Sequence, residues 1–169
     1  MKGSGFLYIR KDIKIHPYAD GGAQENRLRA GTENVAAIVA MAVALKKNCE
    51  RMKESAAKLN KLENIFLNAL TQGGIDFIRN GGECHLPGNI NISIKDADGE
   101  MLLHRLDLMG ICVSTGSACD SVNTKLSHVI EAIRVPKLYA QGTIRITFGF
   151  DNTEYEAVTI AKSIRRILG

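Results

Sequence analysis

The chain has 169 residues, the length of one domain or of one domain with an additional arm. Its hydrophobic fraction of 45% and charged fraction of 24% are typical of globular proteins and exclude a largely disordered chain. The net charge of +4 is mild, and much of it alternates with glutamates along one predicted helix. This pattern favours a solvated helix face over a surface for an acidic partner or nucleic acid.

The four cysteines, Cys49, Cys84, Cys112 and Cys119, show neither a C-x-x-C pair nor the spacing of a zinc site. The first residues contain too short an apolar run for a secretion signal, so we expect reduced thiols in a cytoplasmic protein without a bound metal. No run of about 18 apolar residues occurs, and we expect no membrane-spanning segment.

The first 34 residues predict an arm with little apolar surface of its own. Phe6 to Arg10, which lie between glycines and a charged pair, predict a short strand. Residues 16–34 are polar and rich in turn-forming residues, which predicts a loop held by specific contacts.

A long helix is predicted from Val35 to about Leu70, because apolar residues recur there at spacings of three or four. Asn34 or Thr32 can cap its start, and the glycine pair that follows residue 72 ends it. At 1.5 Å per residue the helix is about 50 Å long. We therefore expect it to bend, to break or to connect two domains.

Beyond this helix, short strands and helices alternate in the pattern of an α+β domain. Isoleucines alternate with polar residues over 89–94 and 143–148, which predicts two half-buried strands. Further strands are predicted at 76–79 and 110–113, and helices at 99–108, 125–134 and 153–168. The last helix opens with a capping-box pattern. We expect a short, mostly antiparallel sheet covered by helices.

The stretch S-T-G-S-A-C-D-S at 114–121 is the most unusual in the chain, because every residue is small or polar. Such a segment is not held by side-chain packing, so Cys119 is expected to be exposed, whereas Cys112 is expected in an apolar strand. Nucleophilic attack needs an accessible thiolate, which Asp120 opposes. The alternative is an ordinary loop cysteine.

Two other stretches contain candidate binding residues. Arg145, in the strand predicted at 143–148, lies on the face opposite the isoleucines and is suited to a bidentate grip on a carboxylate. The alternative is an ordinary surface arginine. Thr32 and the first N–H groups of the long helix can bind a phosphate, or can simply cap the helix. The four histidines are scattered, with no triad partner evident.

Five segments, taken in order, resemble the cysteine desulfurases, a branch of the class-V aminotransferase-like enzymes that use pyridoxal phosphate. They read G-G-A-Q-E-N-R-L-R-A-G-T-E-N at 21–34, L-P-G-N-I-N-I-S at 86–93, G-E-M-L-L-H-R-L-D at 99–107, S-T-G-S-A-C at 114–119 and T-I-R-I-T-F-G at 143–149. The resemblance implies the C-terminal portion of a fold-type I enzyme. Residues 1–34 would be a remnant of the large cofactor domain, 35–72 a connecting helix, and 73–169 the C-terminal α+β domain.

The resemblance also implies roles for three residues. Cys119 is similar to the family cysteine that takes the sulfur as a persulfide, and Arg145 to the arginine that binds the substrate carboxylate. Thr32 is similar to the residue that reaches the cofactor phosphate across a dimer interface. The Schiff-base lysine has no counterpart here, because Lys2-Gly3 matches only the end of its motif. We therefore expect this chain alone to bind no pyridoxal phosphate and to be inactive.

The implied parent reaction converts L-cysteine to L-alanine and leaves sulfur on Cys119. The resemblance implies a homodimer, a sulfur-acceptor or scaffold protein as partner, and a role in iron–sulfur cluster assembly. It implies neither a membrane nor direct nucleic-acid binding. The alternatives are a selenocysteine lyase or another class-V aminotransferase-like enzyme, and a non-catalytic dimerisation or sulfur-relay module.

Overall fold

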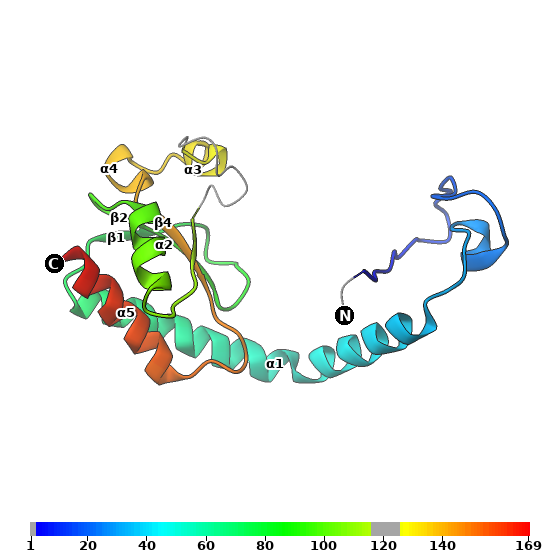
Figure 1. The fold of residues 1–169 in the computed structure, drawn as a ribbon, viewed down its shortest axis with the longest axis horizontal. Helices are drawn as coiled ribbons and strands as arrows, with labels where there is room; N and C mark the ends of the chain where they lie inside the picture. Colours follow the sequence, from blue (N-terminus) through cyan, green and yellow to red (C-terminus); the bar gives the residue numbers. More distant parts are fainter. Residues whose placement is uncertain (1–2, 116–125) are drawn as a thin grey trace. The chain divides into compact units, whose positions relative to one another are not determined.

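The computed structural model describes residues 3–115 and 126–169 (Figure 1). The chain divides into two compact units, Met1–Met52 and Lys53–Gly169, and each is described separately. Their boundary falls within helix α1 (Val35–Gln72), which is one element of 38 residues. Residue 119 and its neighbours from 116 to 125 lie outside the described residues.

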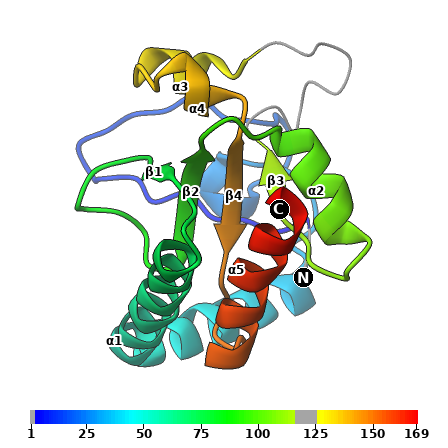
Figure 2. The same ribbon diagram turned by 90° about the vertical axis from the view of Figure 1, so that its left-hand side faces the viewer.

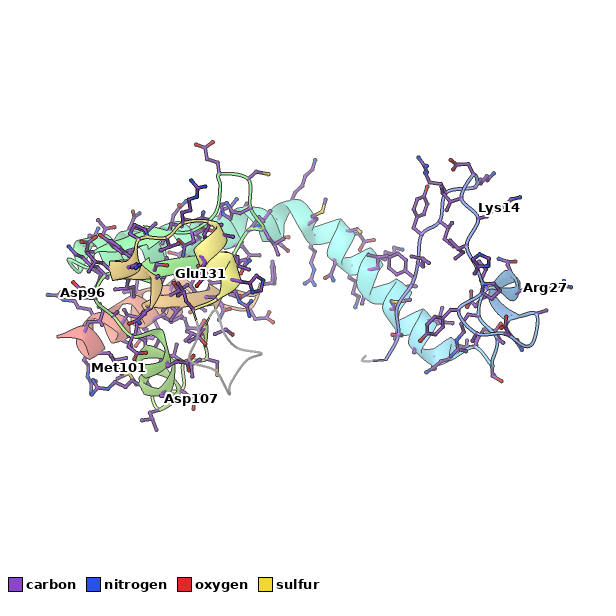
Figure 3. The ribbon with its side chains drawn as sticks, turned by 90° about the horizontal axis from the view of Figure 1, so that it is seen from above. Lys14, Arg27, Asp96, Met101, Asp107 and Glu131 are labelled. Carbon is purple, nitrogen blue, oxygen red and sulfur yellow. The ribbon has the colours of Figure 1, made fainter. Side chains whose placement is uncertain are left out.

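The first unit consists of an exposed arm and the beginning of α1. A short 3-10 helix, η1 (Gln24–Arg27), and a single bridge between Ala19 and Arg29 are the regular structure of its arm. Lys14 and Arg27 project from this arm as exposed basic side chains (Figure 3). The strand predicted from Phe6 to Arg10 is wrong. A strand needs a neighbouring backbone to pair with, and no described segment pairs with these residues.

Helix α1 begins and ends where the sequence pattern predicts. The Asn34 side-chain oxygen accepts a hydrogen bond from the Ala37 N–H at 3.2 Å, so Asn34 caps the start. Gly74, with φ +75°, adopts the left-handed conformation that terminates a helix. In the second unit the helix buries Leu62, Phe66 and other apolar side chains.

The second unit contains a four-stranded antiparallel sheet of order β1-β2-β4-β3. Its strands are β1 (Phe77–Arg79), β2 (Asn89–Ile94), β3 (Ser114–Thr115) and β4 (Thr143–Thr147). The predicted α+β class with a mostly antiparallel sheet is confirmed. Strand β4 lies between β2 and β3, so residues about 50 positions apart in the sequence are paired.

The strand predicted at 110–113 is wrong, because β3 begins at Ser114. The Ile111 N–H donates to the Leu106 carbonyl at 2.9 Å, and Gly110 has φ +75°, so the preceding residues form the end of a helix. Cys112 is therefore exposed and lies outside any strand, contrary to the expectation of an apolar strand.

Helices α2 (Gly99–Asp107) and α5 (Glu154–Leu168) join α1 around the sheet (Figure 2). Their buried side chains and the isoleucines of β2 and β4 form one core cluster. Two short helices, α3 (His128–Ala132) and α4 (Lys137–Ala140), precede β4. The described part of the helix predicted at 125–134 is confirmed before Pro136, whereas α4 was not predicted. Among the described residues, no helix combines the length and apolar character needed to cross a bilayer.

The predicted capping box at the start of α5 is present. The Glu156 carboxylate accepts from the Thr153 backbone N–H at 2.7 Å, and the Thr153 hydroxyl accepts from the Glu156 N–H at 3.3 Å. The Thr153 backbone bond, with bonds from the side chains of Asn152 and Thr153, lowers the pKa of Glu156 below its ordinary value.

This lowered pKa predicts how Glu156→Gln changes the pH dependence of stability. A carboxyl whose folded pKa is depressed stabilises the fold above its unfolded pKa, about 4.3, and that stabilisation is lost as the pH falls through the folded value. Between about pH 5 and 3, the urea midpoint of the unmodified chain should therefore fall more steeply than that of Glu156→Gln. Glu54→Gln, at an exposed site on α1, serves as control. Parallel curves for all three proteins would contradict the prediction.

Candidate functional site

Arg145 lies on the polar face of the sheet. Its neighbours Ile144 and Ile146 are buried on the opposite face, while Arg145 itself is exposed. The register places Asn91 of β2 beside Arg145 on one side and Ser114 of β3 on the other. The predicted orientation of Arg145, opposite the isoleucines, is confirmed, and the guanidinium is accessible to a ligand.

The residues around Arg145 are neutral hydrogen-bonding groups. The Asn80 amide nitrogen donates to Asn91 Oδ1 and to Ser93 Oγ, both at 2.7 Å. The Ser93 hydroxyl is also 2.7 Å from the Thr143 hydroxyl. Thr143 is buried, although it shares the strand face of the exposed Arg145. Within residues 3–115 and 126–169, no carboxylate forms an ion pair with Arg145. The Arg145 guanidinium therefore has the charge and the donors to hold an incoming carboxylate.

Thr32 lies in the first unit, exposed, next to Gly31 with its φ of +108°. Two N–H groups at the start of α1 are already engaged: that of Val35 donates to the Glu33 carbonyl, and that of Ala37 donates to the Asn34 side chain. The exposed Thr32 hydroxyl remains a candidate donor to a phosphate. Thr32 and Arg145 belong to different units.

Cys119, the predicted nucleophile, lies outside the described residues. The last described residues before it, Ser114 and Thr115, form β3 and pair directly with Arg145 and Ile144. Cys49, Cys84 and Cys112 are all exposed. The exposure of Cys112 differs from the buried position that the sequence suggested for it.

Sequence reasoning missed Asn91, which lies beside Arg145, and Asn80, which lies beside Asn91. The strand pattern places Asn91 on the polar side of a strand and predicts no role for Asn80. The signal was the alternation N-I-N-I-S-I at 89–94, which places three hydrogen-bonding side chains on one face. The pairing of that face with Arg145 depends on the strand order.

A sequence model of the aminotransferase class-V family matches residues 1–159. The chain belongs to this family. This class-V chain is 43% identical over 168 residues to "Cysteine desulfurase IscS" of Dictyoglomus turgidum, covering 99% of the chain and 43% of that relative. It is 38% identical to "Putative cysteine desulfurase IscS 1" of Bacillus subtilis, covering 45% of it. The chain thus spans less than half the length of these relatives.

Solved structures agree with this membership. A NifS-like protein superimposes with a TM-score of 0.81 at 36% identity, covering 95% of this class-V chain and 41% of the other. A NifS-like protein from Rickettsia africae superimposes with a TM-score of 0.76 at 28% identity, covering 92% and 41%. The fold is therefore that of a portion of NifS-like proteins.

Pyridoxal phosphate is implied for full-length members of this family. The exposed Thr32 hydroxyl fits the phosphate of this group as a hydrogen-bond donor, and it is the residue that the sequence suggested for that phosphate. Two cavities of the second unit, of about 240 and 300 Å³, lie at the ends of α2 and α5 and beside the turn after α1. Neither is lined by Arg145. Among the described residues, no cluster of His, Cys, Asp and Glu forms a metal site.

Proposed function

We propose that this chain is part of a cysteine desulfurase, in which L-cysteine is converted to L-alanine and its sulfur is left on Cys119 as a persulfide. The observation that carries the proposal is the pairing of β3 with β4 at Ser114 and Arg145. The segment that contains Cys119 follows β3 directly, so the thiol and the carboxylate-binding arginine arise from neighbouring strands. The names of the relatives support the same activity.

Arg145 binds the substrate carboxylate through two parallel N–H donors and thereby orients the sulfur toward Cys119. In the net reaction the Cβ–S bond of cysteine breaks, and an S–S bond to Cys119 forms. The former Cβ keeps the bonding electron pair and gains the proton of the Cys119 thiol. Alanine is the reduced product, and the sulfur on Cys119 is oxidised. Pyridoxal phosphate, when bound, supplies the electron sink for this cleavage.

The remaining parts of the proposal concern the cofactor and partners. Thr32 would contact the cofactor phosphate across a homodimer, and the 169 residues alone would neither bind pyridoxal phosphate nor turn over cysteine. Domain boundaries at 34 and 72 are proposed on the same resemblance. A sulfur-acceptor or scaffold protein in the cytoplasm would receive the persulfide sulfur for iron–sulfur cluster assembly.

A hybrid enzyme tests this function. In it, the 169 residues replace the matching 43% of the Dictyoglomus turgidum cysteine desulfurase. We expect the hybrid to release alanine from L-cysteine and Cys119→Ser to be slower by about 1000-fold or more, because the sulfur acceptor is removed. Arg145→Gln should raise KM by about 10- to 100-fold, the worth of a charged hydrogen-bond pair.

Two controls and two further assays separate the alternatives. The unaltered relative sets the reference rate, and visible absorbance of the hybrid shows that the cofactor site is assembled. A selenocysteine lyase would act on selenocysteine and leave cysteine unchanged. A coloured hybrid in which Cys119→Ser releases alanine at the unmodified rate would refute the proposal. A relay module would accept sulfur from a persulfide donor at Cys119 without releasing alanine.

A further inference from the structure

One polar side chain from each of four neighbouring backbone segments forms a row across the polar face of the sheet. Asn80 follows β1, and its N–H donates to the Asn91 carbonyl at 2.9 Å. Asn91 of β2 lies opposite Arg145 of β4, and Arg145 lies opposite Ser114 of β3. Arg145 is the single charged residue in this row of four, so the row is complementary to an anion.

Which group donates and which accepts can be deduced for the hydrogen bonds at one end of this row. The Thr143 hydroxyl is 2.7 Å from the Ala140 carbonyl, which only accepts, so its one proton is used there. Ser93 must therefore donate to Thr143 across their 2.7 Å contact. Ser93 then accepts from Asn80, and the Asn80 atom at that contact is the amide nitrogen.

The orientation of the Asn80 amide in turn fixes that of Asn91. The Asn80 amide nitrogen also lies 2.7 Å from the Asn91 side chain, so the Asn91 atom that it meets must be the carbonyl oxygen. The Asn91 NH₂ group is left at the other end of its amide. Within the described ranges, no group accepts a hydrogen bond from that nitrogen. Ser93 and Thr143 are 0% and 4% exposed, so this series of hydrogen bonds begins in the protein interior.

We infer that Asn91 is a second contact for the substrate carboxylate beside Arg145, and that Asn80 is the positioning residue that turns the Asn91 NH₂ group toward it. Side chains directly opposite in an antiparallel pair have Cβ atoms about 4.5–5.5 Å apart, so one carboxylate can meet both. The reversed amide would present an oxygen and repel the carboxylate. The inference rests on the proposed role of Arg145 and adds a determinant of substrate class, an α-carboxylate.

The orientation is tested first in the 169-residue chain by NMR, without ligand. We expect the side-chain NH₂ protons of Asn80 to exchange with solvent more slowly than those of Asn91. The Asn80 NH₂ group donates to the Asn91 and Ser93 side chains, which protects its protons. Faster exchange at Asn80 would overturn the deduced direction. This readout does not depend on any activity.

Carboxylate binding is tested by titrating the same chain with L-alanine and following the Arg145 Nε–H and Asn91 NH₂ signals. Both signals should report one Kd. Asn91→Leu should weaken binding about 10-fold through loss of a charged hydrogen bond. Asn80→Asp places a hydrogen-bond acceptor beside Asn91 and so reverses the Asn91 amide. It should weaken binding of L-alanine at least as much. The thermal midpoint of both variants shows whether they are folded.

Asn89→Asp is the matched control for Asn80→Asp. It adds the same charge on the same face of the sheet, opposite Thr147, but takes no part in the hydrogen bonds that link Thr143, Ser93, Asn80 and Asn91. Its effect should be smaller and should vanish at high salt, whereas that of Asn80→Asp should persist. If Arg145→Gln weakens binding but the effects of Asn80→Asp and Asn89→Asp are equal and salt-sensitive, the inference about Asn91 and Asn80 is overturned. If Arg145→Gln leaves the Kd unchanged, or if L-alanine does not bind, the proposed role of Arg145 fails instead.

Discussion

Replacing Glu63 with alanine is expected to lower the free energy of unfolding of the second unit by about 3 kcal/mol. Glu63, on α1, is only 4% exposed. One carboxylate oxygen accepts from Arg79 Nε at 2.8 Å and from Nη2 at 2.7 Å, and the other lies 3.1 Å from His85 Nε2. Without the carboxylate, the largely buried guanidinium loses its counter-charge, which is costly in a medium of low dielectric constant.

The position of this cluster connects the core to the candidate site. Arg79 is the last residue of β1 and precedes Asn80, so its ion pair with Glu63 ties the end of that strand to α1. Loss of the pair should therefore also increase the solvent exchange of the Asn80 amide. Urea denaturation measures the first effect, and NMR measures the second.

Two controls identify the physical cause. Lys61→Ala removes an ion pair to Glu154 whose side chains are more than half exposed, and should cost less than about 1 kcal/mol. The double replacement of Glu63 and Arg79 by methionine removes both buried charges and should recover most of the stability that Glu63→Ala loses. A Glu63→Ala protein as stable as Lys61→Ala would show that the buried pair contributes little.

Phe66→Ala should cost about 3–5 kcal/mol, the range for removing a buried aromatic ring. Phe66 is 0% exposed and lies where α1 packs on the sheet. Its ring meets that of Phe148 edge to face, with centroids 6.0 Å apart and planes at 72°. Truncation removes this contact and leaves a cavity between helix and sheet.

The size of the loss should depend on volume and burial. Phe66→Leu keeps much of the apolar volume and should cost clearly less than Phe66→Ala. Tyr155→Ala removes an aromatic ring that is 79% exposed on α5, and should change the stability by no more than about 0.5 kcal/mol. Equal urea midpoints for Phe66→Ala and Tyr155→Ala would contradict the assigned core.

Elements with a strong local pattern were predicted almost to the residue. The alternation at 89–94 coincides with β2, and the capping box at Thr153 marks the start of α5. Elements whose existence depends on a distant partner were misjudged. The residues from Phe6 to Arg10 have strand-like composition but no described neighbour to pair with, and β3 is defined by its pairing with β4.

The candidate site shows the same division. The orientation of Arg145 followed from the alternation of its strand, because successive side chains of a strand point to opposite faces. The exposure of Cys112 did not follow, because the turn after α2 shifts the start of β3. The pairing of Glu63 with Arg79 and His85 joins residues 16 and 22 positions apart and has no local signature.

From the amino acids alone came the family, the α+β class, the long helix and the identity of Cys119, Arg145 and Thr32 as candidates. These depend on motifs and on periodicities of two and 3.6 residues, which are local properties of a chain. The row of Asn80, Asn91, Arg145 and Ser114, and the direction of the hydrogen bonds behind it, required the fold. Insertion of β4 between β2 and β3 brings these residues together, and such long-range pairing is set by burial of the whole isoleucine face rather than by any short segment.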